Sequence, residues 1–215
     1  MTRLLLLLAP TLLAAAPASD CWQHRKLSRF EQARACFTTA ARSADAWAQA
    51  EGLWGLADYK AANDAFRAAA KTREKDPEVR VRWGRMLLDR FNRNDALDLF
   101  GEALKLTADD APGLLGLALA ASDAFDRRAI DFAVQATEKD PNLVEARELL
   151  AALHLEDVNF PKAADEARMA LKLSPDALDA QALLGAIEIL NDRATIDPSS
   201  NAPLAAMLAR SPAYG

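Results

Sequence analysis

A tetrapeptide and its spacing constrain this chain more than any other feature. The sequence Glu-Lys-Asp-Pro occurs at residues 74–77 and again at residues 138–141, and Pro175 follows Pro141 by 34 residues. A period of about 20 to 50 residues is typical of proteins that stack one small unit many times. Because no such unit can bury its apolar surface alone, each must pack against its neighbours. The sequence therefore predicts a stacked-repeat architecture.

Small, aromatic and alanine residues recur inside these units at fixed offsets. One unit shows the whole pattern, with Ala151, Ala163, Ala167, Ala170 and Pro175. The unit containing Gly84 repeats it with Ala96, Phe100 and Ala103. The unit between them has alanines at 129, 133 and 136, and the same offset then places Leu117 in the small position, with Gly116 one residue early. The small residue lets two helices approach closely, and the larger one fills the groove beside it.

Composition and prolines favour an all-α chain. Alanine and leucine dominate, whereas the chain has only 8 glycines and 2 tyrosines, and this balance favours helices over strands. Asp76, Asp140 and Ser174 each precede a proline. A side-chain acceptor followed by proline is typical of a helix start, so we expect a first helix to begin at each of these three places.

With these landmarks the chain resembles the tetratricopeptide family. Trp83-Gly84, Leu150-Ala151 and Leu184-Gly185 correspond to the family's large-then-small pair, and Phe37, Phe66 and Phe100 to its second-helix aromatic. The resemblance implies a right-handed α-solenoid of stacked antiparallel helix pairs. It would cover residues 19–190, as about five units plus the first helix of a sixth.

The N-terminus has the pattern of a cleaved signal peptide. Arg3 precedes an apolar run over residues 4–16, and Ala16-Pro17-Ala18 supplies small residues before Ser19. A membrane anchor is the alternative, but the run is short against the roughly 20 residues that span a bilayer. We expect residues 1–18 to be removed and the mature protein to be periplasmic or extracellular, without a membrane span.

The only two cysteines, Cys21 and Cys36, fall at the mature N-terminus. Export permits a disulfide between them, which would close a small helical hairpin. Two reduced and buried thiols are the alternative, and the sequence leaves both open.

The last residues depart from the repeat. Residues 191–215 contain the interruptions Asn191-Asp192-Arg193 and Asp197-Pro198, and the chain stops soon after Pro212. We expect this to be the N-terminal piece of a longer protein, with a frayed genuine end as the alternative. Arrays behind a signal peptide resemble the front half of some bacterial proteins with a metallopeptidase-like domain. An uncapped end would also permit self-association.

Charge and chemistry both argue against catalysis and nucleic-acid binding. The net charge is −5, although residues 67–93 carry a net +5 and residues 95–192 a net −12. His24 and His154 lack the spacing of a metal site, and no phosphate loop or nucleophile motif is present. We expect no enzyme activity and no cofactor. Nucleic-acid binding through residues 67–93 is a minor alternative, and the four tryptophans are expected to fill the core.

The expected function is binding another protein or a peptide in the concave groove. The family's groove-facing spacing, with the charged residues beside it, selects Val81, Arg82, Arg85, Leu88, Leu114, Ala118, Glu148, Ala152, Leu155, Ala182, Ala186 and Ile189. This would give a small, apolar floor with arginines at one end and carboxylates at the other, suited to an amphipathic helix or an extended peptide.

Overall fold

A computed structural model of the chain describes residues 18–192 and 202–210, and every regular element in them is an α-helix. The helices are α1 (Ala18–Lys26), α2 (Phe30–Ala40), α3 (Ala46–Gly55), α4 (Tyr59–Thr72), α5 (Pro77–Leu88), α6 (Arg93–Leu106), α7 (Ala111–Ser122), α8 (Arg128–Lys139), α9 (Val144–Glu156), α10 (Phe160–Leu173), α11 (Leu178–Asp192) and α12 (Ala202–Arg210). Among these helices, none is long and apolar enough to cross a bilayer. The expected signal segment up to residue 17, residues 193–201 and the last five residues lie outside the described ranges.

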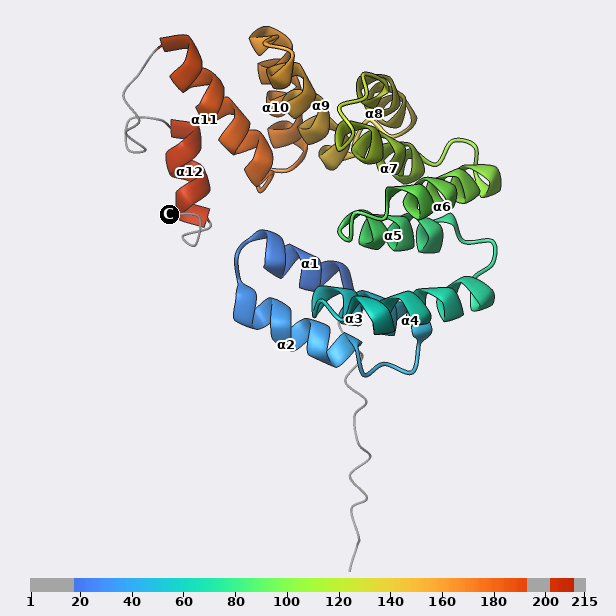
Figure 1. Cartoon of the computed structure of the whole chain (residues 1–215). Helices are drawn as coiled ribbons and strands as arrows, with labels where there is room; N and C mark the ends of the chain where they lie inside the picture. The colour runs from blue at the N-terminus through green and yellow to red at the C-terminus, as the bar shows by residue number, and fades with distance from the viewer. Residues whose placement is uncertain (1–17, 193–201, 211–215) are drawn as a thin grey trace, which may run out of the picture.

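Consecutive helices form antiparallel pairs that follow one another along a curved path (Figure 1). α1 packs on α2, α3 on α4, and the pairing continues to α9 and α10, while α5 also contacts α7 and α7 contacts α9. Apolar clusters therefore lie between helices all along the array instead of around one centre. This is the stacked arrangement that the repeat predicts, because each pair hides its apolar face in its neighbours.

The prolines do not all occupy the same place in the unit. Asp76 caps α5, accepting a hydrogen bond from the amide of Glu78, and Pro77 is the first helical residue, as predicted. Asp140 and Ser174 instead end α8 and α10, and Pro141 and Pro175 lie in the loops before the next helices. The predicted helix starts there are wrong. Proline fits both places because neither the loop nor the first turn needs its missing amide proton.

Each helix pair from α1–α2 to α9–α10 turns at a residue other than glycine in the left-handed conformation. Ala57, Phe91, Phe125 and Val158 have φ angles between 53° and 62° and lie 34, 34 and 33 residues apart. The amide of the next residue then donates back to a carbonyl five residues earlier, as from Asn159 to His154 at 2.8 Å. This bond closes the end of the first helix. The turn is thus the sharpest marker of the repeat.

In the α7–α8 pair, the spacing between the left-handed residue and the first buried alanine of the second helix is one residue shorter than in the other pairs. Phe125 precedes Ala129 by four residues, whereas the matching separation is five in the pairs on either side. Counting back a fixed twelve residues from Ala129 therefore gives the wrong small residue in this unit. The small position is Ala118, which is fully buried against α8 and α9, and the expectation for Leu117 is incorrect.

Phe100 shows why small residues recur in the first helices. The ring is fully buried, and a Cβ added to Gly84 would lie 2.6 Å from it while one added to Gly116 would lie 2.4 Å from it. The ring is therefore held between α5 and α7, where only glycine leaves room. Phe100 joins the third unit to the fourth.

Replacing Val158 with glycine is expected to raise the free energy of unfolding by about 1 kcal/mol, because a β-branched residue is strained at positive φ and glycine is not. Val158 is 69% exposed, so the change sacrifices little buried surface. Urea unfolding followed by circular dichroism measures the difference. Val134→Gly, inside α8, is the matched control and should be destabilising; a loss of stability in both variants would contradict the strain at Val158.

Candidate partner-binding groove

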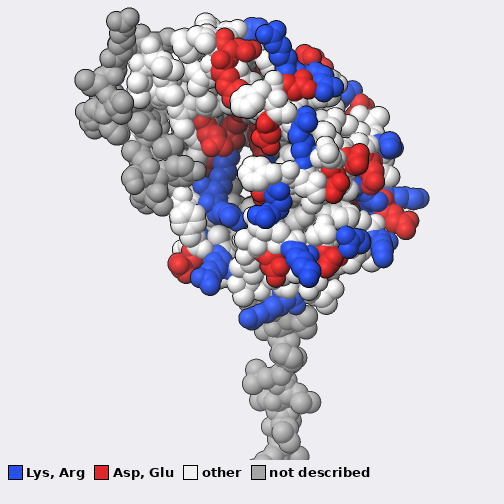
Figure 2. Space-filling model, viewed as in Figure 1, with Lys and Arg blue, Asp and Glu red and all other residues white. Residues whose placement is uncertain are grey.

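The curvature of the array brings α1 back against α9 and α11. Lys26 donates to a Glu148 carboxylate oxygen at 3.1 Å, across 122 residues of sequence. Beside this pair, Leu27 packs on Leu178 and Ala182 of α11. Figure 2 shows acidic and basic side chains meeting around a hollow on this face. The concave side is therefore spanned by contacts between the two halves of the array.

A second ion pair crosses the same space. Arg85 of α5 donates through both terminal nitrogens to the Glu145 carboxylate of α9, with Nη1 at 2.7 Å from Oε2. These residues line a polar cavity of about 570 Å³, together with Lys26 and Glu148. One arginine of the net-positive segment is thus neutralised by a glutamate of the net-negative segment across the groove.

Arg82 also lines this cavity, and its guanidinium is held by a carboxylate and two aromatic rings. It donates twice to Glu51, at 2.7 Å each, and its guanidinium lies 4.5 Å from the Trp54 ring centroid and 5.3 Å from that of Trp22. The Trp22 indole donates to the same carboxylate at 2.6 Å. Glu51 is 2% exposed. The tryptophans thus pack around an internal arginine instead of forming an open cage.

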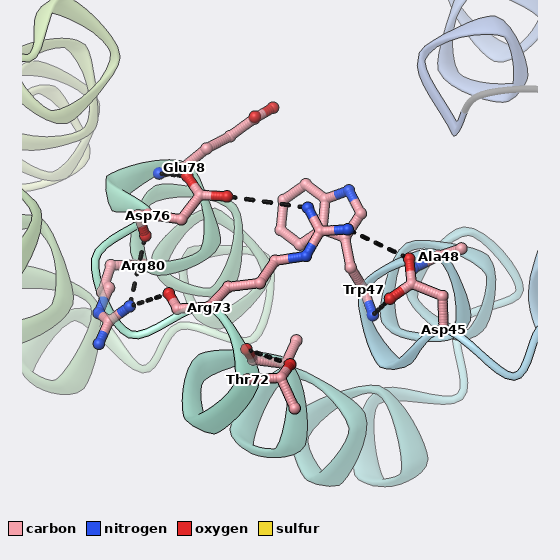
Figure 3. Close-up of polar contacts among 9 residues, drawn as sticks. Asp45, Trp47, Ala48, Thr72, Arg73, Asp76, Glu78 and Arg80 are labelled. Atoms are coloured by element: carbon pink, nitrogen blue, oxygen red, sulfur yellow. Dashed lines mark hydrogen bonds and ion pairs between the residues drawn. The ribbon is translucent and has the colours of Figure 1, made fainter.

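The other arginines of the basic segment also have intramolecular partners. Arg73 reaches from the end of α4 to Asp45 at 3.3 Å and lies over Trp47, while Arg80 donates to the Arg73 carbonyl (Figure 3). Arg67, Arg90 and Arg93 contact Asp64, the Tyr59 ring and the Ala120 carbonyl. Much of the positive charge of residues 67–93 is engaged within the fold.

The two groove carboxylates have pKa values displaced in opposite directions. Burial raises the pKa of Glu148, and the opposing effect of Lys26 is smaller. Burial also acts to raise the pKa of Glu145, but the charge and hydrogen bonds of Arg85 outweigh it and the pKa is lowered. The Arg85 pKa is raised, because the attraction of Glu145 exceeds the effect of burial. The Glu145–Arg85 ion pair therefore stabilises the folded state, whereas the ionised form of Glu148 destabilises it.

We expect Glu148→Gln to be at least as stable as the parent at pH 7 and Glu145→Gln to be less stable, by at most about 1 kcal/mol because Glu145 is 41% exposed. Because the pKa of Glu148 is raised, its ionised form lowers the stability of the parent above that pKa. The stability advantage of Glu148→Gln over the parent should therefore disappear as the pH falls through that pKa and Glu148 takes up a proton. Glu145, with its lowered pKa, stabilises above the ordinary carboxyl pKa and loses that contribution as the pH falls through the lowered value. Urea unfolding at pH 7, 5.5 and 4 tests the order; equal losses at pH 7 would contradict it.

Three carboxylates lie between the polar cavity and a second, apolar pocket. Glu145, Glu148 and Asp179 line both. The apolar pocket has a volume of about 480 Å³ and lies between α7, α9 and α11, with walls formed by Leu119, Leu149, Ala152, Ala182, Leu183 and Ala186. Four pairs in this lining are separated by 34 residues, such as Glu145 with Asp179 and Leu149 with Leu183. Equivalent positions of successive first helices therefore build one continuous surface.

The expected groove residues divide into three groups. Glu148, Ala152, Ala182 and Ala186 line the apolar pocket, and Arg82 and Arg85 line the polar cavity. Leu88, Leu155 and Ile189 are half-buried and line neither of these two spaces, with Leu88 and Leu155 packed on core clusters. Val81, Leu114 and Ala118 are buried in the core, so their assignment to the groove floor is wrong.

The error at Ala118 follows from the spacing between Phe125 and Ala129, which is one residue shorter than in the other pairs. Once the unit is shifted by one residue, Leu119 is equivalent to Ala152 and Ala186, and Leu119 does line the pocket. Leu149 and Leu183 were also missed, although their helical spacing from Glu145 and Asp179 on one face was available in the sequence. Lys26 was missed for a different reason, since its contact depends on the curvature of the whole array.

Cys21 and Cys36 form a disulfide that joins α1 to α2, with 5.4 Å between their Cα atoms. It fastens α1, which ends at Lys26 and is followed by Leu27, to the second helix of the first pair. Within residues 18–192 and 202–210, no group of three or more histidine, cysteine or acidic side chains is arranged to hold a metal ion.

Comparison with known proteins gives a likeness in structure but none in sequence. No protein-family profile and no curated protein sequence matches the chain. The thermophilic tetratricopeptide protein TTC0263 of Thermus thermophilus matches with a TM-score of 0.65 at 17% identity, over 80% of this chain and 97% of that one. PilF of Pseudomonas aeruginosa matches at 0.60 and 15%, over 90% and 89%, and the MamA protein at 0.55 and 17%, over 75% and 87%. This chain therefore has the tetratricopeptide fold, an α-solenoid of antiparallel helix pairs.

Proposed function

We propose that this chain is an exported scaffold that binds a segment of another protein in the apolar pocket between α7, α9 and α11. The main observation in support of this proposal is the apolar pocket itself. Its volume of about 480 Å³ is as large as that of a small-molecule pocket, roughly 300 to 1,000 Å³, so it can hold side chains of a partner. Its walls come from equivalent positions of successive first helices, so the surface continues from one unit to the next and can hold a partner segment that spans both.

Binding is favoured over catalysis by the chemistry of the lining. The pocket is lined by leucines, alanines and three carboxylates, and it offers no serine, cysteine or histidine as a nucleophile or general base. Two of the carboxylates are held by Arg85 and Lys26. Such a surface recognises shape and charge.

Export is supported by two independent features. The first eighteen residues have a positive start, an apolar run and small residues before Ser19. The Cys21–Cys36 disulfide is suited to an oxidising compartment. Mass spectrometry of the protein isolated from the native host should find an N-terminus at Ser19 and no free thiol. An intact Met1 N-terminus or two alkylated cysteines would argue against export.

The binding proposal is tested by narrowing the pocket without changing its charge. Ala186→Gln adds a longer neutral side chain at a half-buried pocket position and keeps good helix propensity. Ala68→Gln, on the exposed face of α4, is the matched control. Affinity capture from the exported fraction should recover a partner with the parent and Ala68→Gln, and at least tenfold less with Ala186→Gln. Equal recovery with both variants would remove the pocket from the binding site.

A further inference from the structure

The apolar pocket has one charged edge, and this edge is incompletely neutralised. Glu145 and Glu148 are engaged by Arg85 and Lys26, whereas Asp179 is exposed and has no ion-pair partner among the described residues. Asp179 acts to raise the pKa of Glu148, which reports its negative charge at that site. Two of the three carboxylates are thus held in ion pairs, and the negative charge of Asp179 lies without an ion pair, in the described part of the chain, at the rim of the apolar pocket.

The chain itself shows which groups these carboxylates accept. Lys26 places an ammonium 3.1 Å from Glu148, and its alkyl stem comes from a helix whose next residue, Leu27, packs on Leu178 and Ala182. A basic residue beside an apolar one is therefore already bound to these carboxylates from the polar cavity. The same three carboxylates also line the apolar pocket.

We propose that the occupant of the apolar pocket is a helical segment of a partner protein that presents a leucine-like side chain and, one turn away, a lysine or arginine. This inference rests on the proposed binding function and specifies the class of partner. The apolar side chain fills the space between α7, α9 and α11, and the cation pairs with Asp179. A lysine or arginine three or four residues from the apolar anchor lies on the same helix face. An acidic segment meets like charges at this rim and is rejected.

Lys26 also affects partner binding, because its intramolecular ion pair already neutralises Glu148. Removing its charge leaves Glu148 free to attract the partner's cation. Lys26→Met is therefore expected to strengthen binding of a basic segment, whereas Asp179→Asn weakens it. Opposite effects from two neighbouring variants are not expected from damage to the fold, which would weaken binding in both.

Selection of random 16-residue peptides displayed on phage against the disulfide-bonded mature protein tests the partner class. Enriched peptides should carry lysine or arginine three or four residues from leucine, isoleucine or phenylalanine. Synthetic versions are then titrated by fluorescence anisotropy, and replacing the basic residue with glutamate should reduce affinity at least tenfold. Asp179→Asn should weaken binding at least threefold and Lys26→Met should strengthen it at least threefold. Asp98→Asn on α6 and Lys60→Met on α4, both exposed, are the charge-matched controls and should change affinity less than twofold.

The outcomes separate the two proposals. If the enriched peptides lose affinity with Ala186→Gln but are neutral or acidic, or if Asp179→Asn and Lys26→Met shift affinity in the same direction or leave it unchanged, the partner class is wrong and the pocket remains a binding site. If the enriched peptides bind Ala186→Gln as tightly as the parent, the pocket is not the binding site and the proposed function fails with it.

Discussion

Replacing Phe100 with alanine is expected to lower the free energy of unfolding by about 4 kcal/mol. The ring is fully buried between Gly84 of α5 and Gly116 of α7, and neither glycine has a side chain that can move into the vacated space. The variant therefore loses the buried apolar surface of the ring and keeps a cavity. Since stability in a solenoid depends on the interface between adjacent units, the loss falls at the junction of the third and fourth pairs.

Urea unfolding followed by circular dichroism measures this loss. Phe91→Ala is the matched control, because that ring is 95% exposed and its removal leaves no cavity. We expect the control to change the free energy of unfolding by less than about 0.5 kcal/mol. A Phe100→Ala protein as stable as the control would mean that the glycines do not hold the ring as described.

Replacing Glu51 with alanine is expected to cost about 3 to 5 kcal/mol. The carboxylate is 2% exposed and accepts two hydrogen bonds from Arg82 and one from the Trp22 indole. Removing it leaves the Arg82 guanidinium largely buried without its counter-charge, and α1 loses a polar contact with α3. This variant should be among the most damaging single changes in the first three units.

A double variant distinguishes loss of the charge partner from loss of packing. Glu51→Ala with Arg82→Met removes the uncompensated cation and should recover at least 1 kcal/mol of the single-variant loss, because the two residues act as a pair. Glu138→Ala on the exposed face of α8 controls for removing a glutamate from a helix. Strictly additive losses from Glu51→Ala and Arg82→Met would contradict the pairing.

The repeat pattern predicted the fold because it records local packing. Residues such as Gly84, Ala96, Phe100 and Ala103 sit where one helix pair meets the next, and their sizes are fixed by that contact. The same logic failed in the fourth unit. There the spacing from Phe125 to the first buried alanine of α8 is one residue short, so counting back from the second helix gave the wrong small residue in the first.

The groove depended on information of a different kind. Ala152, Ala182 and Ala186 could be projected onto the pocket because successive first helices present equivalent positions at intervals of about one unit. Arg82 and Arg85 were projected with equal justification, yet Glu51 and Glu145 engage them. Glu145 lies 60 residues from Arg85, so no pattern within one unit could show that Arg85 is already paired.

By itself, the sequence determined the helix pairs, their stacking and the spacing of the groove face, since each depends on contacts between residues within about one unit of each other. Only the tertiary structure decided how far the array curves. The curvature sets Lys26 against Glu148 and Leu27 against Leu178, and so determines which carboxylates are already paired when a partner arrives. Small rotations between successive units add up along the chain, so the meeting of its two ends is a property of the sum and of no single repeat.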